Sequence, residues 1–266
     1  MSIKIYQAFY RDDQLSELDL EFTPYDNRAN PIEHIYEHYL YHQTRKLSLA
    51  DNIERWGTFS WQWKRKLPGP TAADIINYVN SHPEADVVIF NAWPENESFS
   101  YNVWEQGEWC HPGILELGYA VMGAMGEDPL LIEAPMTHTN YVLANYFVGN
   151  QKFWDGLLDF LDRYVNCIKW LSPEHQKLIS SSAGYPYNHK LDFTGFICER
   201  LISTYLVKEQ DNLTIVPWGT PHDAFSNAKL IAVEEQSKEL MHEWNNHRVT
   251  PGGATKIATP WIENAF

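Results

Sequence analysis

The segment ADVVIFNAWP, residues Ala85–Pro94, constrains the fold more than any other stretch of the chain. Its apolar residues are continuous, and an asparagine and a proline close the run. A short run of this kind is typical of a strand buried on both faces, because helices cover both sides of the sheet in an α/β protein. The segment therefore predicts an α/β fold.

The remaining patterns predict strands that alternate with helices. Strands are expected at 3–10, 58–66 (ending in a basic loop), 85–94, 128–134, 141–150 and 213–218. Helices are expected at 32–47, 71–82, 112–125, 151–170, 191–206 and about 226–247. Thr71 and Asp74 form a capping box at the start of the second helix, and Pro112 suits the first position of the third. Turn formers predict connecting segments at 23–31 and 180–189.

No repeat, low-complexity tract or linker divides the 266 residues. We therefore predict one α/β domain over 1–266, with a central mixed, mostly parallel sheet flanked by helices. The C-terminal helix and the tail after it are expected to pack on this domain.

Charge and composition restrict the partners. The net charge of -15 disfavours nucleic acid and anionic lipid, which bind clustered cations. No apolar stretch is long enough to span a bilayer, and the first residues lack the hydrophobic region of a secretory signal. Cys110, Cys167 and Cys198 lie far apart, without metal-ligand spacing. These features predict a reduced, cytoplasmic protein.

Several common catalytic motifs are absent from the sequence. It contains no glycine-rich dinucleotide or P-loop phosphate motif, no H-E-x-x-H, no G-x-S-x-G and no D-x-D. The absence of D-x-D matters because paired aspartates after a buried strand commonly hold a divalent ion on a sugar diphosphate.

The segment NVWEQGEWCHPG combines charged and aromatic residues at unusual density. Glu105 and Glu108 are candidates to bind sugar hydroxyls, to act as a base, or to ligate a divalent ion together with His111. Trp104 and Trp109 lie beside them and could pack on the flat faces of a sugar. The alternative is a pair of solvated acids, with His111 capping the helix that follows.

Two later segments, NYVLANYFVGNQKFWDGLLDFLDRYV and FTGFICERLISTYL, resemble small bacterial glycosyltransferases of the GT-A type from surface-polysaccharide gene clusters. The earlier pieces TPYDNRANP, SWQWKRK, DVVIFNAWP and VWEQGEWCHPG are similar as well, so the resemblance extends from about residue 3 to 207. It implies a GT-A-like (Rossmann-like) domain that transfers a sugar from a nucleotide-sugar donor to a glycan or lipid-linked glycan acceptor. The nucleotide is then expected over the carboxyl ends of the strands.

The chain departs from this family after the buried strand. Asn91 and Trp93 stand where many GT-A enzymes have the D-x-D, so a requirement for Mn²⁺ or Mg²⁺ stays open. The basic run Lys64, Arg65 and Lys66 is a candidate to neutralise the diphosphate instead.

Glu199 is the leading candidate for the catalytic base. At helical spacing it shares a face with small residues, which leaves room for a ligand, and apolar neighbours would raise the pKa of its carboxyl group. Ion pairing with an arginine is the alternative role.

The first strand and the turn after it supply further candidate ligand contacts. Tyr6 and Tyr10 could stack on a base or pack in the core. Asp26 and Asn27 could meet the nucleotide, although Asp-Asn is also ordinary turn chemistry. Arg28 could contact phosphate or stay in solvent. His222, in a late loop, is one more candidate for the diphosphate.

Two other function classes remain open. One is a non-catalytic glycan- or nucleotide-sugar-binding protein with a degenerate GT-A fold. The other is a hydrolytic enzyme with two carboxylates across one cleft. The sequence leaves the donor, the acceptor, the stereochemical course and the oligomeric state undetermined.

Overall fold

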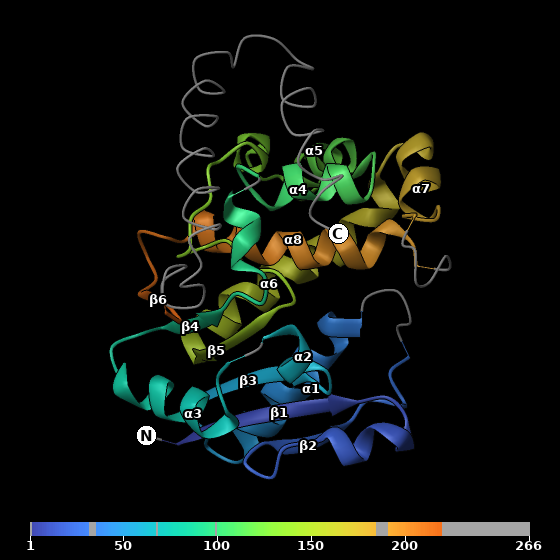
Figure 1. The fold of residues 1–266 in the computed structure, drawn as a ribbon. Coiled ribbons are helices and arrows are strands. Elements are labelled where there is room, and N and C mark those ends of the chain that lie inside the picture. The colour runs from blue at the N-terminus through green and yellow to red at the C-terminus, as the bar shows by residue number, and fades with distance from the viewer. Residues whose placement is uncertain (1, 32–35, 68, 99, 185–190, 220–266) are drawn as a thin grey trace.

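A mixed six-stranded sheet forms the centre of the molecule. The computed structural model describes residues 2–31, 36–67, 69–98, 100–184 and 191–219 (Figure 1). Within these residues the strand order is β2-β1-β3-β5-β4-β6. The strands are β1 Ile3–Phe9, β2 Thr23–Asp26, β3 Arg55–Ser60, β4 Val87–Phe90, β5 Tyr146–Asn150 and β6 Ile215–Pro217. All neighbours pair in parallel except β5, which is antiparallel to both β3 and β4. The predicted mixed, mostly parallel sheet is confirmed.

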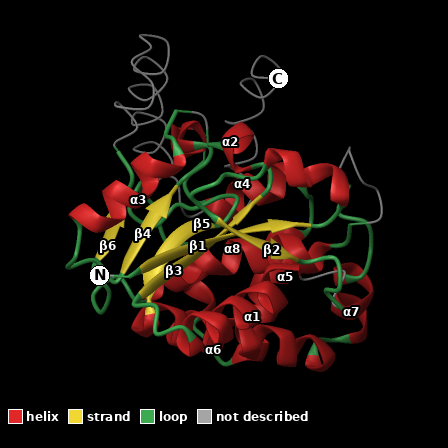
Figure 2. Ribbon diagram, turned by 90° about the horizontal axis from the view of Figure 1, so that it is seen from below, coloured by secondary structure: helices red, strands yellow, loops and turns green. Residues whose placement is uncertain are grey.

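Helices cover both faces of the sheet (Figure 2). The α-helices are α1 Tyr36–Ala50, α2 Trp63–Lys66, α3 Ala72–Ser81, α4 Val103–Cys110, α5 Ile114–Met125, α6 Gln151–Cys167, α7 Pro173–Ile179 and α8 Phe193–Lys208. Short 3-10 turns are η1 Asp12–Glu17, η2 Pro94–Ser98, η3 Pro129–Ile132 and η4 Ile168–Trp170. One core joins the sheet to α1, α4, α5, α6 and α8, and a smaller one joins its other face to α2 and α3. The four residues of β4 are fully buried between these cores, as their apolar run predicts.

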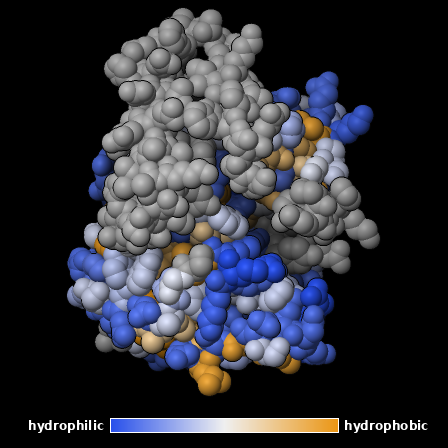
Figure 3. All heavy atoms as spheres, viewed as in Figure 1, coloured by the Kyte–Doolittle hydropathy of each residue, from blue (hydrophilic) through white to orange (hydrophobic). Residues whose placement is uncertain are grey.

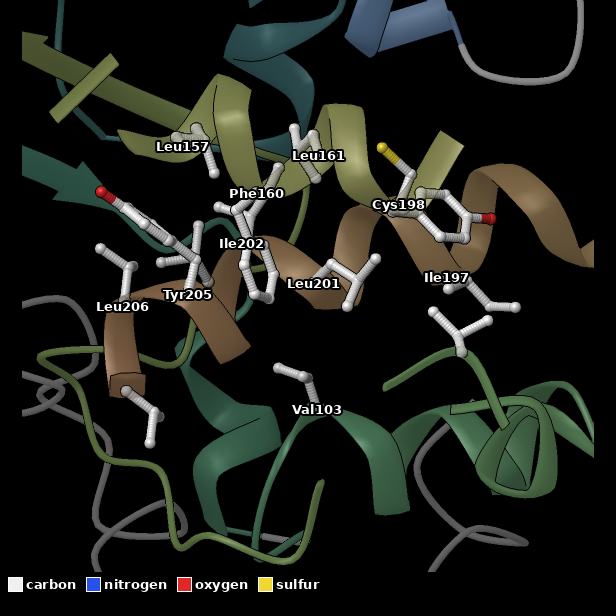
Figure 4. Close-up of a cluster of buried hydrophobic side chains, with 14 of the residues drawn as sticks. Val103, Leu157, Phe160, Leu161, Ile197, Cys198, Leu201, Ile202, Tyr205 and Leu206 are labelled. Atoms are coloured by element: carbon white, nitrogen blue, oxygen red, sulfur yellow. The ribbon is translucent and has the colours of Figure 1, made fainter. Parts of the chain in front are cut away.

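The larger core is built around α8. Leu201 and Ile202 of this helix are fully buried, and they pack toward Leu157 and Leu161 of α6 on one side and Val103 of α4 on the other (Figure 4). A helix with apolar residues on most of its surface is stable only inside a protein. Packing on both sides therefore holds α8 rigidly under the sheet.

Most of the predicted elements are confirmed, with boundary shifts. The strands at 3–10, 85–94 and 213–218, and the helices at 71–82, 151–170 and 191–206, match β1, β4, β6, α3, α6 and α8. The capping box of α3 is present, with the Thr71 hydroxyl accepting from the Asp74 amide and the Asp74 carboxylate accepting from the Thr71 amide. Residues 36–47 of the first predicted helix lie in α1.

Five predictions are corrected. The segment 58–66 is a strand only in its first residues, which end β3, and its predicted basic loop is the helix α2. The segment 23–31 begins with the strand β2, which lies at the sheet edge, where a proline such as Pro24 is tolerated. Residues 128–134 form the turn η3 rather than a strand. Only the second half of 141–150 is a strand, because Ala144 and Asn145 have positive φ angles. Helix α5 begins at Ile114, after a left-handed Gly113, so Pro112 precedes it.

The predicted closing helix at about 226–247, the tail after it and His222 lie outside the described residues. Their packing on the domain stays a prediction. Within the described ranges, no helix is long and apolar enough to cross a membrane. The surface is mainly hydrophilic over the lower part of the view in Figure 3, where β1, β2 and α2 lie in Figure 1.

Glu127 couples pH to stability. Its buried carboxylate accepts hydrogen bonds from Lys208 at 2.8 Å and from Arg163, which join α8 to α6. Burial raises the pKa of Glu127, but these two bonds outweigh that effect and hold it below its usual value. A carboxyl group whose pKa is lower in the folded than in the unfolded chain stabilises the fold at pH values above its unfolded pKa. This stabilisation is lost as the pH falls through the folded pKa.

We expect Glu127→Gln to lower the free energy of unfolding by about 2 kcal/mol at pH 7. The difference from the unmodified protein should shrink as the pH falls below about 4.5, where the carboxyl group becomes protonated in the unfolded chain. Urea unfolding at neutral pH and at a pH below about 4.5 measures this difference in the free energy of unfolding. Asp159→Asn is the control, since Asp159 is an exposed partner of Arg163 and its loss should cost less than about 1 kcal/mol. A difference independent of pH would contradict this assignment.

Candidate active site

The carboxyl ends of the strands form one edge of the sheet. Phe9 at the end of β1 pairs with Asp26 at the end of β2, and Phe90 at the end of β4 pairs with Tyr146. Because β5 runs antiparallel, it begins at this edge rather than ending there. Ligands of open α/β sheets bind outside the carboxyl ends of the strands, so the residues gathered here are the first candidates for a site.

Two carboxylates from different helices lie within electrostatic range of each other near this edge. Glu199 of α8 accepts a hydrogen bond at 2.8 Å from the amide of Ala144, in the turn that leads into β5. Its Oε2 atom lies 3.8 Å from Nη1 of the buried Arg200, so the ion pair considered as its alternative role is present. Glu37 lies in the first turn of α1 and keeps partial contact with solvent. Desolvation by surrounding protein atoms raises the pKa of Glu37, and the nearby charge of Glu199 raises it further. The two side chains are therefore close enough to influence each other's charge.

Tyrosine hydroxyls lie near this pair. Burial raises the pKa of Tyr146, and the charges of Glu199 and Glu37 add to the effect. The Tyr146 hydroxyl shares a hydrogen bond of 2.7 Å with Ser60 at the end of β3. The charges of Glu37 and Glu199 also act on Tyr41 of α1, whose pKa is raised chiefly by burial. The charges of the two carboxylates thus act on tyrosine hydroxyls from the sheet and from α1.

A cation and an aromatic ring lie beside the carboxylates. The ammonium group of Lys66, at the end of α2, is 5.7 Å from the centroid of the Trp93 ring, in the loop after β4. Both side chains are half-buried. The charge of Lys66 acts on Glu37 and partly offsets the rise in its pKa. Lys66 is therefore the member of the predicted basic run that faces the carboxylates.

Three buried polar groups at or near this edge have no partner among the described residues. They are both amide atoms of Asn27, the amide oxygen of Asn145 and the hydroxyl of Tyr41. Asn27 directly follows β2, and its backbone amide donates to Phe9. A buried polar group without a partner costs about 1–3 kcal/mol, so such groups are rare unless water or a ligand satisfies them. Asn27 and Asn145, which adjoin β2 and β5, are therefore candidates to bind water or a ligand at this edge.

Three predicted ligand contacts lie in the core instead. Trp104 is fully buried, and its indole N–H donates to Thr204 at 2.8 Å. Tyr6 is buried, with its hydroxyl 3.0 Å from that of Ser48. His111 is buried, with its Nδ1 2.7 Å from the carbonyl oxygen of Ala183. These aromatic rings pack within the fold. Burial lowers the pKa of His111, and the nearby charge of Glu199 acts on it in the opposite direction, so this buried ring lies within electrostatic range of that carboxylate.

Glu105 and Glu108 bind backbone amides. The carboxylate of Glu105 accepts from the amide of Tyr101 at 2.6 Å, just before α4. That of Glu108 accepts from the amides of Gly113 and Leu115, both at 2.9 Å, at the start of α5. The opening amides of a helix need such acceptors, which explains Glu108. Glu105 instead fixes the backbone just before the N-cap Asn102 of α4. The structure does not bring either glutamate together with Glu199 and Glu37.

Two of the other predicted ligand contacts, Arg28 and Lys64, are paired with carboxylates of the protein itself. Arg28 is paired with Asp26 and Asp12, and these bonds hold the pKa of Asp26 at about 2. Lys64 is paired with Asp19 at 2.6 Å, away from Trp93.

Two predicted contacts remain near the carboxyl edge. Asn91, in the D-x-D position, accepts from the amide of Trp93 and donates to Glu97, both at 3.1 Å. Its side chain therefore shapes the loop that presents Trp93. Tyr10 follows β1 at the carboxyl edge and acts on the pKa values of Tyr41 and Tyr146.

Comparisons with known proteins gave one structural likeness. No protein-family model matches the chain, and a search of curated proteins found no match. Among solved structures, the chain is similar to the apo structure of a bifunctional glycosyltransferase, WbbM, at 12% sequence identity and a TM-score of 0.45. The alignment covers 82% of this chain and 44% of that one, so the chain spans less than half of that protein.

Proposed function

We propose that the chain is a glycosyltransferase whose active site is the carboxyl edge of the sheet. It would move a sugar from a nucleotide-sugar donor to a glycan or lipid-linked glycan acceptor, in the cytoplasm, during assembly of a bacterial surface polysaccharide. One observation carries the proposal: the charges of Glu199 and Lys66 both act on Glu37, and Lys66 lies over the Trp93 ring, at the edge where an α/β sheet binds its ligands. The sequence resemblance supplies the reaction class and the pathway.

Each group in the cluster suits one part of this reaction. Glu199 takes the proton from the acceptor hydroxyl as its oxygen bonds to the anomeric carbon. The bond from that carbon to the diphosphate breaks, and Lys66 meets the charge that develops on the leaving group. Trp93 offers a face to the sugar ring, and Glu37 accepts hydrogen bonds from its hydroxyls.

A nucleotide screen is the first test. Thermal unfolding is measured with UDP, GDP, CMP, dTDP and their common sugars, each with and without Mn²⁺. One nucleotide should raise the Tm by several degrees, because saturation at 100 times Kd adds about 2.7 kcal/mol of stability. Comparison of the two conditions then establishes whether an ion assists binding. If no nucleotide changes the Tm, the donor assignment is wrong.

Neighbouring lysines provide a sharper test of the site. Lys66→Ala should weaken binding of the active nucleoside diphosphate by about tenfold or more, because a desolvated cation on phosphate contributes roughly 1.5–3 kcal/mol. Lys64→Ala should change it less than about twofold, since Lys64 is an exposed partner of Asp19. Isothermal titration calorimetry measures both. Equal effects of the two substitutions would contradict the placement of the diphosphate at Lys66.

A binding protein without activity is the second candidate. Asn91 favours this function. It stands in the position where many GT-A enzymes hold an ion, and its side-chain amide instead forms hydrogen bonds within its own loop. This function predicts nucleotide-sugar binding without release of nucleoside diphosphate. Mass spectrometry of the reaction with glycan acceptors separates the two, and it also detects hydrolysis as transfer to water.

A further inference from the structure

A cluster of side chains that can ligate a metal joins α1 to α6, on the face of the sheet that the larger core covers. His38 and His42 are four residues apart in α1, so they lie on one side of that helix. Asp162 reaches them from α6. Its Oδ1 atom is 2.6 Å from Nε2 of His38 and 2.8 Å from Nε2 of His42. Two imidazole nitrogens and one carboxylate oxygen thus converge on a single point between two helices.

The donor atoms are spaced closely enough to share one ion. Their ligand atoms all lie within 4.8 Å of one another. Around a tetrahedral ion with ligands at about 2.0–2.1 Å, neighbouring ligand atoms are separated by about 3.3 Å. Rotation of exposed side chains suffices for that change, since the side chains of His42 and Asp162 are 37% and 43% exposed.

The chemistry of the ligands selects the kind of ion. Imidazole nitrogen suits Zn²⁺ and neighbouring transition metals, whereas Mg²⁺ and Ca²⁺ prefer sites made entirely of oxygen. The buried ring of His38 anchors the cluster, and the exposed side chains of His42 and Asp162 give an ion access from solvent. Because His42 and Asp162 are partly exposed, water can fill the remaining coordination positions.

We propose that His38, His42 and Asp162 form a site for a divalent transition-metal ion of the zinc type. The ion links α1 to α6. Glu37 immediately precedes His38, so the link also holds the first turn of α1, from which Glu37 reaches the carboxyl edge. This last consequence rests on the proposed function, but the metal site does not.

Calorimetric titration with Zn²⁺, and optical titration with Co²⁺, test the site in the complete chain. The unmodified protein should bind one Zn²⁺ at this cluster with a Kd below about 10 µM. His42→Ala should weaken that binding by about 100-fold and Asp162→Asn by about tenfold or more. The d–d absorption of bound Co²⁺ should disappear in His42→Ala. Circular dichroism verifies that both variants remain folded, as expected for partly exposed positions.

Two matched variants control for other ligands. His175 faces a single carboxylate, that of Glu116, at 3.2 Å, so His175→Ala should retain the binding. Cys110→Ser, which removes the exposed thiol, should retain it too. The proposal is overturned if the protein shows no saturable binding of Zn²⁺ below about 1 mM. That result is expected if the three side chains only form hydrogen bonds that join α1 to α6. The proposal is equally overturned if His42→Ala binds as tightly as the unmodified protein. Neither result depends on sugar transfer, so failure here leaves the proposed function standing.

Discussion

Glu199→Gln is expected to reduce sugar transfer by about 10²- to 10⁴-fold, the usual contribution of a general base. The amide keeps an oxygen that can accept the hydrogen bond from Ala144, so the turn before β5 should hold its shape. An amide cannot take a proton from the acceptor hydroxyl at neutral pH. The rate of nucleoside diphosphate release, measured with the donor that the thermal screen identifies, reports this loss.

Another carboxylate provides the control for this experiment. Glu116 is exposed on α5 and paired only loosely with His175, so Glu116→Gln should transfer sugar at the normal rate. Nucleotide affinity should stay within about twofold in both variants, because neither side chain meets the diphosphate in the proposed arrangement. Full activity in Glu199→Gln would remove this residue as the base. Loss of activity in Glu108→Gln at unchanged stability would move the site to α4.

Gly57→Ala is expected to have the largest effect on stability. A Cβ atom at Gly57 of β3 would lie 2.4 Å from the backbone oxygen of Phe147 and 2.8 Å from a methyl group of Val148, both in β5. A backbone atom in a central strand cannot move aside as a flexible side chain can. Overpacking in a core typically costs 1–3 kcal/mol, so we expect a loss of about 3 kcal/mol or more in urea unfolding.

The same substitution at Gly123 should raise the free energy of unfolding rather than lower it. This glycine lies in α5, is exposed, and would place its Cβ with no atom within 4 Å. Alanine is favoured over glycine in helices by about 1 kcal/mol, so Gly123→Ala should stabilise the protein. Equal stabilities for the two variants would contradict the close approach of β3 to β5 at Gly57.

Local chemistry accounts for the elements that the sequence predicted well. Thr71 and Asp74 cap α3 with their own side chains, and the apolar run of β4 needs burial on both faces. The errors arose where tertiary context decides. The segment around Pro24 has turn residues, yet it pairs with β1 because an edge strand needs hydrogen bonds on one side only. The segment 128–134 is apolar, and its packing against α5 needs only a turn.

Three residues selected from the sequence lie near one edge of the sheet, and their roles in a reaction stay predictions. Glu199, Lys66 and Trp93 were selected from the sequence, and the structure places them near the same edge. Glu37 was missed, because a glutamate in an amphipathic helix pattern resembles any solvated residue. A signal was available: the first turn of a helix that follows a strand lies at the carboxyl edge. Glu105 accepts from a backbone amide, and its role as a ligand contact stays a prediction, because backbone capping and ligand binding favour the same polar residue types.

The antiparallel strand β5 has a consequence for the order in which the protein assembles during synthesis. Val148 of β5 pairs with Gly57 of β3, and about 90 residues of chain separate these partners. A ribosome that adds roughly 5–20 residues per second needs several seconds or more to make that interval. Until β5 emerges, β4 has no neighbouring strand on either side, since its other partner, β6, comes later still. The apolar run of β4 must therefore wait unpaired on the nascent chain, where chaperones and aggregation compete for it.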